Sequence, residues 1–138
     1  MTQKWLSPAV TSFFFVDVID MVVQSSISVN SEFWGFQYFQ NEFITACSNT
    51  VTWIDASSGN SIETYQTSGD TYYLYSYNRK DIVCADGSNK VSRIVNGKKT
   101  FVYSHDQLSH PRGIDIDFDG NIYICCYSSK NIHQITED

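Results

Sequence analysis

Three stretches of this sequence repeat at a spacing close to forty residues. Phe43, Ile82 and Ile122 each begin a short apolar run, and the steps between them are 39 and 40 residues. A second run follows each of these after a small polar turn. The second runs begin at Val51, Val91 and Ile132. A repeat of this length indicates stacked supersecondary units, each of which buries its apolar faces only against its neighbours.

Each unit consists of short apolar segments separated by turn residues, and no segment has a helical period. Residues 113–118 alternate apolar and acidic side chains, which is typical of a strand with one buried side. Hairpin turns are expected at Gly59, at Asn96-Gly97 and at Asp119-Gly120. The sequence therefore predicts an all-β fold, a β-propeller of about three four-stranded blades with strands of about four to seven residues.

The expected blades cover residues 34–69, 70–108 and 109–138, which are fewer than the roughly four to eight blades of a complete propeller. Two explanations remain open. The chain is part of a longer protein, or it is half a ring that another chain completes. In either case the blades at the two ends have open apolar faces, and we expect the isolated chain to self-associate.

Residues 1–33 match the repeat poorly. Their apolar stretch, residues 13–23, is interrupted by Asp17 and Asp20 and is shorter than the roughly 20 residues that cross a bilayer. We expect it to form one or two buried strands, the remnant of a preceding blade.

Charge and cysteine usage limit the partners. The 138 residues include 9 Lys and Arg against 15 Asp and Glu, a net charge of −6, and no basic run exceeds two residues. Bases dispersed in this way disfavour nucleic acid as the ligand.

The four cysteines lie in or beside apolar strands and form no C-x-x-C pair. They are Cys47, Cys84, Cys125 and Cys126. We expect buried, reduced thiols and hence a reducing compartment, the cytoplasm.

Residues 108–124 resemble the NHL repeat. The resemblance rests on Pro111-Arg112-Gly113-Ile114, on Asp119-Gly120-Asn121 and on Ile122-Tyr123-Ile124. The two earlier units lack the first two elements. Thr67-Ser68-Gly69 and residues 100–105 also resemble the C-terminal propeller of tripartite-motif proteins. In that family a RING, a B-box and a coiled coil precede the propeller and carry ubiquitin-ligase activity. Their Cys/His clusters do not occur in this sequence, so the resemblance assigns no ligase activity to it.

In propellers of this design, the connections between blades and the turns between second and third strands emerge on one face. Loops on a rigid scaffold commonly carry binding residues, and Tyr and Arg often anchor interfaces. The candidate binding residues are Tyr72, Asn89, Lys90, His110, Arg112, Tyr127 and Lys130. Two alternatives remain open here: Tyr72 packs under its loop, and Arg112 pairs with a neighbouring acid.

The sequence offers no catalytic or metal constellation. Asp115, Asp117 and Asp119 have the spacing that opens a calcium loop, but Cys126 stands where that loop needs a glutamate. We expect Asp117 to accept backbone hydrogen bonds instead. His133 alternates with apolar neighbours and is expected to be a hydrogen-bonded, partly buried ring. We predict no catalytic residue, no metal and no cofactor.

The predicted function is that of a non-enzymatic recognition module for a protein partner. The alternatives are an RNA-binding propeller, since some proteins of the resembling family read single-stranded RNA on this face, and a fragment of a tripartite-motif ubiquitin ligase. Membrane association is not expected.

Overall fold

The computed structural model describes residues 11–29 and 32–136, and within them the chain forms thirteen strands and no helix. The strands form four antiparallel sheets in which chain neighbours pair. Sheet I contains β1 (Thr11–Val16) and β2 (Val23–Val29). Sheet II contains β3 (Gly35–Phe39), β4 (Glu42–Cys47), β5 (Thr50–Asp55) and β6 (Ser61–Gln66). Sheet III contains β7 (Leu74–Asn78), β8 (Asp81–Ala85), β9 (Lys90–Val95) and β10 (Lys98–Ser104). Sheet IV contains β11 (Pro111–Ile116), β12 (Ile122–Cys126) and β13 (Asn131–Ile135).

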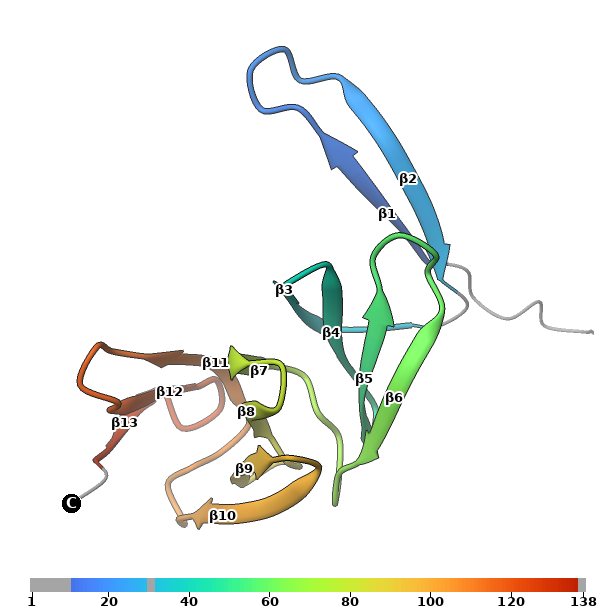
Figure 1. The fold of residues 1–138 in the computed structure, drawn as a ribbon. Helices are drawn as coiled ribbons and strands as arrows, with labels where there is room; N and C mark the ends of the chain where they lie inside the picture. The colour runs from blue at the N-terminus through green and yellow to red at the C-terminus, as the bar shows by residue number, and fades with distance from the viewer. Residues whose placement is uncertain (1–10, 30–31, 137–138) are drawn as a thin grey trace, which may run out of the picture.

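The all-β prediction is confirmed, and strand lengths of five to seven residues fall within the expected range. The forty-residue repeat corresponds to one sheet: its first runs are β4, β8 and β12, and its second runs lie in β5, β9 and β13. Asn96 and Gly97 both have positive φ, at 51° and 71°, as a tight two-residue hairpin requires. Figure 1 shows the sheets following one another in chain order, with the β1–β2 hairpin projecting from one end.

Three apolar clusters hold the sheets together. Val29, Phe43 and Ile54 join sheet I to sheet II, where Phe13 and Phe15 of β1 pack against them. The cluster between sheets II and III comprises Ile44, Val51, Trp53, Ile82, Cys84 and Ile94. The cluster between sheets III and IV comprises Val83, Val91, Leu108, Ile122, Ile124 and Cys126. Consecutive residues of one strand therefore serve opposite interfaces, as the period-two geometry of a strand requires.

Two sequence-based expectations were wrong at strand ends. The strand expected over residues 113–118 ends at Ile116, because the Asp117 carboxylate accepts the N–H groups of Asp119 and Asn121 and turns the chain. Phe118 is consequently fully exposed. The expected role of Asp117 as a backbone acceptor is confirmed.

The apolar stretch at 13–23 is only partly buried. It forms β1 and then a turn, because Asp17 accepts hydrogen bonds from the N–H of Ile19 through its side chain and of Met21 through its carbonyl. Val18 and Ile19 in that turn are exposed. The part of the expected blade remnant that covers residues 1–10 lies outside the described residues.

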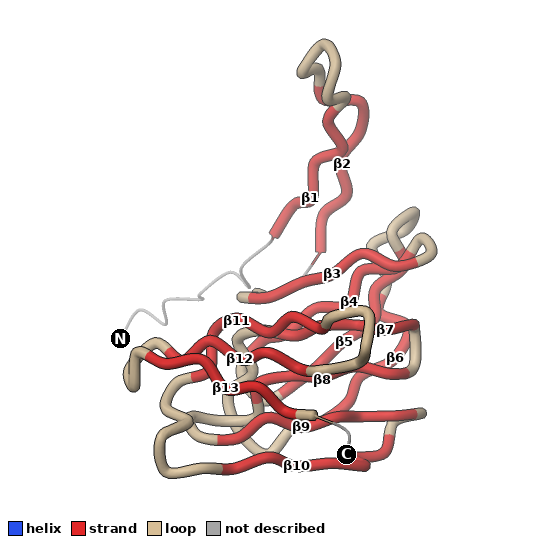
Figure 2. Tube along the Cα trace, turned by 90° about the vertical axis from the view of Figure 1, so that its left-hand side faces the viewer, coloured by secondary structure: helices blue, strands red, loops and turns tan. Residues whose placement is uncertain are grey.

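Burial of all four thiols was also a wrong expectation. Cys84 and Cys126 are buried, Cys47 is half-buried and Cys125 is exposed, and all four are free. Cys125 lies on the side of sheet IV that no described sheet covers, whereas Cys126 packs toward sheet III. In Figure 2, which looks at the left-hand side of Figure 1, the strands of sheet IV face the viewer. No helix among residues 11–29 and 32–136 has the length and apolar character needed to cross a membrane.

Candidate functional site

The connections between sheets and the turns between second and third strands come together at one end of the strands, here called the loop end. The evidence is a hydrogen bond that recurs with the repeat. The Thr71 N–H donates to the Ser48 carbonyl, and the His110 N–H donates to the Ser88 carbonyl. Ser48 and Ser88 are forty residues apart in the sequence. Each connection is therefore fixed over the turn of the preceding sheet.

A pocket of about 220 Å³ lies at the loop end, where the connection into sheet III meets the connection into sheet IV. Its lining includes three of the seven predicted binding residues, Tyr72, His110 and Arg112. The other lining residues are Asp70, Gly87, Ser88 and Pro111. The structure thus brings together residues that are up to 42 positions apart in the chain.

Arg112 stacks on an aromatic ring and does not pair with an acid. Its guanidinium carbon lies 4.3 Å from the centroid of the Tyr127 ring, which is exposed and lies outside the pocket lining. No carboxylate among the described residues forms an ion pair with Arg112. A cation–π contact at an exposed site contributes only about 0.5–1 kcal/mol, so it orients the guanidinium without neutralising it.

Tyr72, another lining residue, is held by an aromatic stack. Its ring lies 4.5 Å from the ring of Trp34, centroid to centroid, with an interplanar angle of 14°. Trp34 was not among the predicted residues. The signal that could have identified it is its place in the repeat, 38 residues before Tyr72 and next to the first strand of its own sheet. The Tyr72 hydroxyl is 3.5 Å from an Asp70 carboxylate oxygen, a long contact.

His110 has a left-handed backbone conformation, with φ of 52°, and is fixed from several sides. Its N–H donates to Ser88, and its carbonyl accepts from the N–H of Tyr127. The ring Nδ1 is 3.2 Å from the Ser109 Oγ and 3.0 Å from the Ser128 Oγ. These contacts occupy Nδ1, whereas Nε2 has no hydrogen-bond partner among the described residues.

The Ser128–His110 contact pairs a hydroxyl with an imidazole ring. Hydrolases of the Ser-His-Asp type orient the histidine with a carboxylate, and no carboxylate in the described part of the chain hydrogen-bonds to His110. Residues 11–29 and 32–136 also contain no group of three His, Cys, Asp or Glu side chains that could hold a metal ion.

The remaining three predicted residues do not line the pocket. Asn89 and Lys90 stand at the end of the β8–β9 turn and the start of β9, and both are exposed. Lys130 is exposed in the β12–β13 turn, where its N–H donates to the Cys126 carbonyl. These three residues are at the loop end of the molecule but outside the pocket.

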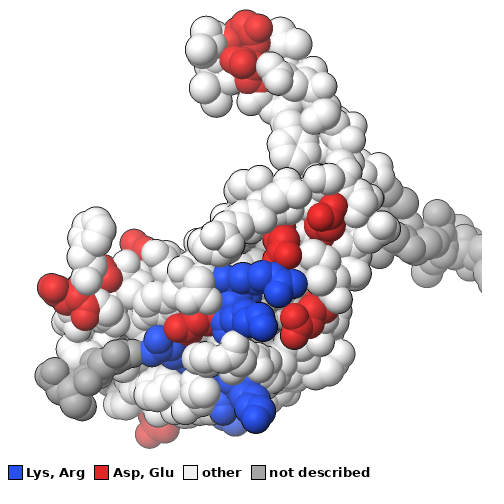
Figure 3. Space-filling view, viewed as in Figure 1, with Lys and Arg blue, Asp and Glu red and all other residues white. Residues whose placement is uncertain are grey.

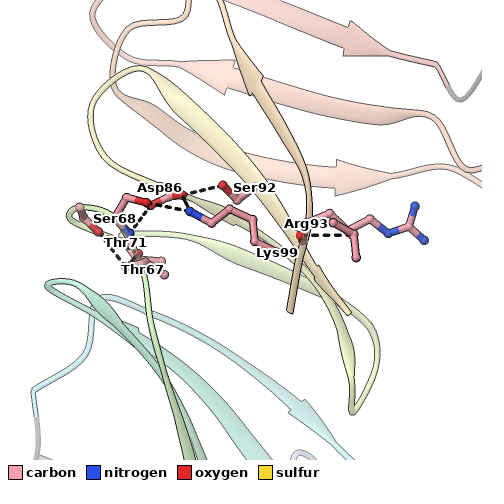
Figure 4. Close-up of polar contacts among 9 residues, drawn as sticks. Thr67, Ser68, Thr71, Asp86, Ser92, Arg93 and Lys99 are labelled. Atoms are coloured by element: carbon pink, nitrogen blue, oxygen red, sulfur yellow. Dashed lines mark hydrogen bonds and ion pairs between the residues drawn. The ribbon is translucent and has the colours of Figure 1, made fainter. Parts of the chain in front are cut away.

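Behind the pocket, a buried carboxylate fixes the connection between sheets II and III (Figure 4). Asp86 accepts hydrogen bonds from the Ser68 N–H at 2.7 Å, the Ser92 hydroxyl at 2.6 Å and the Lys99 ammonium at 2.6 Å. Its side chain is completely buried, whereas that of Lys99 is 26% exposed. Lys99 also donates to the Ser68 Oγ at 2.7 Å.

Burial by itself would raise the pKa of Asp86, but the hydrogen bonds from Lys99, Ser92 and Ser68 outweigh it and lower the pKa below its ordinary value. Asp86 therefore ties the β8–β9 turn to the connection at Ser68, and Gly87, the residue after Asp86, lines the pocket. The sequence alone gave no indication of this role for Asp86, because the donors come from three different segments.

Part of the basic side chains gather on one face, whereas Arg112 lines the pocket and Lys90 and Lys130 lie elsewhere at the loop end. Figure 3 shows Lys and Arg together on one face with acidic side chains directly beside them. Arg79 pairs with Glu42 at 2.7 Å, and Arg93 pairs with Asp81 at 2.9 Å. These acids neutralise much of the local charge on that face.

No protein-family model matches the sequence, and the search of curated proteins finds no match. Solved structures do. The chain is similar to hydrazine synthase from Kuenenia stuttgartiensis, with a TM-score of 0.70 at 16% identity over 90% of this chain. It is also similar to the computationally designed Ika8 protein, with a TM-score of 0.54 at 12% identity over 77% of this chain. At these identities the similarity concerns the fold alone. The chain spans 39% and 37% of those two chains.

Proposed function

We propose that this chain is part of an NHL-type β-propeller that recognises a protein partner at the loop end and carries out no chemistry. One observation supports this proposal most strongly: Tyr72, His110 and Arg112 line a single pocket, with Tyr127 stacked behind Arg112. The blade count and the NHL type rest on the repeat and on the residues that resemble that family. The four free cysteines fit a reducing compartment such as the cytoplasm.

The size of the pocket favours a side chain of a partner over a free metabolite. Small-molecule sites typically enclose about 300–1,000 Å³, and this pocket has about 220 Å³. It is suited to one side chain of a peptide that continues over the surrounding loops. Tyr72 and Arg112 are residue types that commonly anchor such contacts.

Two of the polar groups, Arg112 and His110, favour an acidic side chain, against the repulsion of Asp70 in the same lining. The Arg112 guanidinium has no acidic partner in the described part of the chain, and the His110 Nε2 faces no hydrogen-bond partner there. A glutamate or aspartate of the partner would accept hydrogen bonds from both groups, and bonds to charged groups contribute about 1.5–3 kcal/mol each. The flat Tyr72 ring, stacked on Trp34, would contact the apolar part of the same peptide.

The test is a selection from a random-peptide display library on the immobilised chain, followed by measurement of Kd for the selected peptides. We expect enrichment of sequences with an acidic residue beside an apolar one. Arg112→Ala should weaken their binding by about tenfold to a hundredfold, the equivalent of about 1.4–3 kcal/mol. Lys80→Ala is the matched control, because it removes an exposed cation at the other end of the strands and should leave Kd unchanged.

RNA is the second candidate, because stacked aromatic and Arg side chains are also how proteins hold unpaired bases. The test is filter binding of single-stranded RNA at physiological salt. Sub-micromolar affinity that is lost in Arg112→Ala or Lys130→Ala would make RNA the ligand. Binding no better than to a neutral control would favour the protein partner.

A further inference from the structure

We propose that the loop-end pocket receives the amino-terminal residue of the partner, an Asp or Glu with a free α-ammonium group. Asp70 binds the ammonium group, and Arg112 and His110 bind the side-chain carboxylate. This inference rests on the proposed function and names the residue that enters the pocket. Its starting point is the lining, which holds one acid and one guanidinium, Asp70 and Arg112, on two different connections between sheets.

These two charges are not neutralised within the described part of the chain. The Asp70 carboxylate has one polar contact there, the 3.5 Å contact with the Tyr72 hydroxyl. The Arg112 guanidinium stacks on the Tyr127 ring. Among residues 11–29 and 32–136, no ion pair joins Asp70 to Arg112. Both residues are exposed, so each can meet a ligand of opposite charge.

The fold keeps the two charges apart, because each stands on a fixed backbone. The Asp70 carbonyl accepts the Gly87 N–H at 3.0 Å. The next residue, Thr71, is 0% exposed and donates its N–H to the turn of sheet II. On the other connection, Pro111 directly before Arg112 is fully buried. A ligand therefore meets both charges already in place, and binding requires little ordering of the site.

A ligand that carries only a carboxylate is attracted by Arg112 and repelled by Asp70. Like charges placed side by side in an interface oppose binding, whereas complementary charges favour it and fix the orientation of the ligand. A ligand with an ammonium group beside its carboxylate meets a complementary charge at both places. The lining therefore selects for the pair of charges and against a lone acid.

The size of the pocket indicates that one residue supplies both charges. Its volume of about 220 Å³ lies below the range of about 300–1,000 Å³ that is typical of small-molecule sites. An Asp or Glu at a free amino terminus carries both charges within a single residue, whereas an internal Lys-Glu pair has to place two side chains in the same space. The peptide then leaves the pocket past Tyr72, whose stacking partner Trp34 is 47% exposed.

The test is isothermal titration calorimetry of the wild-type chain with three synthetic peptides. They are Glu-Leu-Ala-Ala amide with a free amino terminus, its N-acetylated form, and acetyl-Lys-Glu-Leu-Ala amide. We expect the free form to bind about fivefold to tenfold more tightly than either of the other two, the equivalent of about 1–1.4 kcal/mol.

Asp70→Asn should change the three affinities in opposite directions. The free form should bind about fivefold to tenfold more weakly than it binds to wild type, because its ammonium group loses its counter-charge. The acetylated form should bind more tightly, because Asp70 no longer repels its carboxylate. Asp119→Asn is the matched control, since it removes an exposed carboxylate from the β11–β12 turn at the other end of the strands and should leave all three affinities unchanged.

Circular dichroism and urea unfolding of each variant verify that it is folded. Equal affinity for the free and the acetylated peptide, with dependence on Arg112 retained, would overturn this inference and leave the proposed function standing. Tighter binding of the Lys-Glu peptide than of the free form would also overturn it, because a lysine side chain would then be the source of the positive charge. If none of the peptides binds in an Arg112-dependent way, the proposed function fails and this inference fails with it.

Discussion

Removing the buried charge of Asp86 should destabilise the fold more than a change at most other polar positions. Asp86→Ala deprives the Ser68 N–H, the Ser92 hydroxyl and the Lys99 ammonium of their common acceptor. Removing one partner of a buried ion pair costs about 3–5 kcal/mol. Lys99 is 26% exposed and can regain water, so we expect the low end, about 3 kcal/mol. That is a large part of a typical domain stability of about 5–15 kcal/mol.

Urea unfolding measures this cost as a lower midpoint with an unchanged m-value. Asp86→Asn keeps an acceptor oxygen and should cost about 2 kcal/mol, because the hydrogen bond to Lys99 loses its charge. Lys99→Met is the companion variant. If the two groups act as a pair, the cost of the double variant Asp86→Asn/Lys99→Met falls below the sum of the single costs. A change below about 0.5 kcal/mol for Asp86→Ala, the range of ordinary surface substitutions, would refute the reasoning.

The pH dependence follows from the same network. The pKa of Asp86 is lower in the folded chain than the value of about 3.9 in an unfolded one. A lowered folded-state pKa contributes stability that is fully present above the unfolded pKa and is lost as pH falls through the folded pKa. We therefore expect the wild-type free energy of unfolding to decline below about pH 4, and to decline less steeply in Asp86→Asn.

Two further predictions concern cysteine reactivity and backbone packing. Burial raises the pKa of Cys84 to about 12. Treatment of the dilute native chain with iodoacetamide at pH 8, followed by peptide mapping, should therefore modify the exposed Cys125 and leave Cys84 unmodified until urea is added. Equal labelling of both cysteines would contradict the structure. Gly35→Ala places a Cβ 2.5 Å from the Tyr72 carbonyl oxygen. This variant should lower the free energy of unfolding, measured in urea, by about 1–3 kcal/mol, as overpacking does. Gly113→Ala should lower it less, because its Cβ meets only a side-chain carbon at 3.3 Å.

The repeat made the strands and their order predictable, because each apolar run and each turn residue acts locally. Asn96-Gly97 is an example: its positive φ values follow from the residue types alone. The ends of the strands were less predictable. Phe118 was assigned to a strand because it continues an alternating pattern, but the hydrogen bonds of Asp117 end that strand two residues earlier.

The candidate site was predictable in outline, because connections and turns of such units meet at one end. It was not predictable in detail, because contacts between sheets depend on geometry that no spacing encodes. Trp34 and Asp86 are the clearest examples: each contributes through a residue of a different segment, Tyr72 for the first and Lys99 for the second. Cys125 was expected to be buried because neighbouring apolar residues suggested it, and the missing cover of sheet IV leaves it exposed.

The measurement that tests the proposed recognition site most directly is a backbone NMR titration of the ¹⁵N-labelled chain with a selected acidic peptide. We predict that the largest shift changes occur at the amides of Gly87, Ser88, His110 and Arg112, which surround the pocket. The amides of Asn96 and Gly97, at the opposite end of the strands, should not move. Saturable binding with shift changes confined to that opposite end, and none at the loop end, would contradict the account.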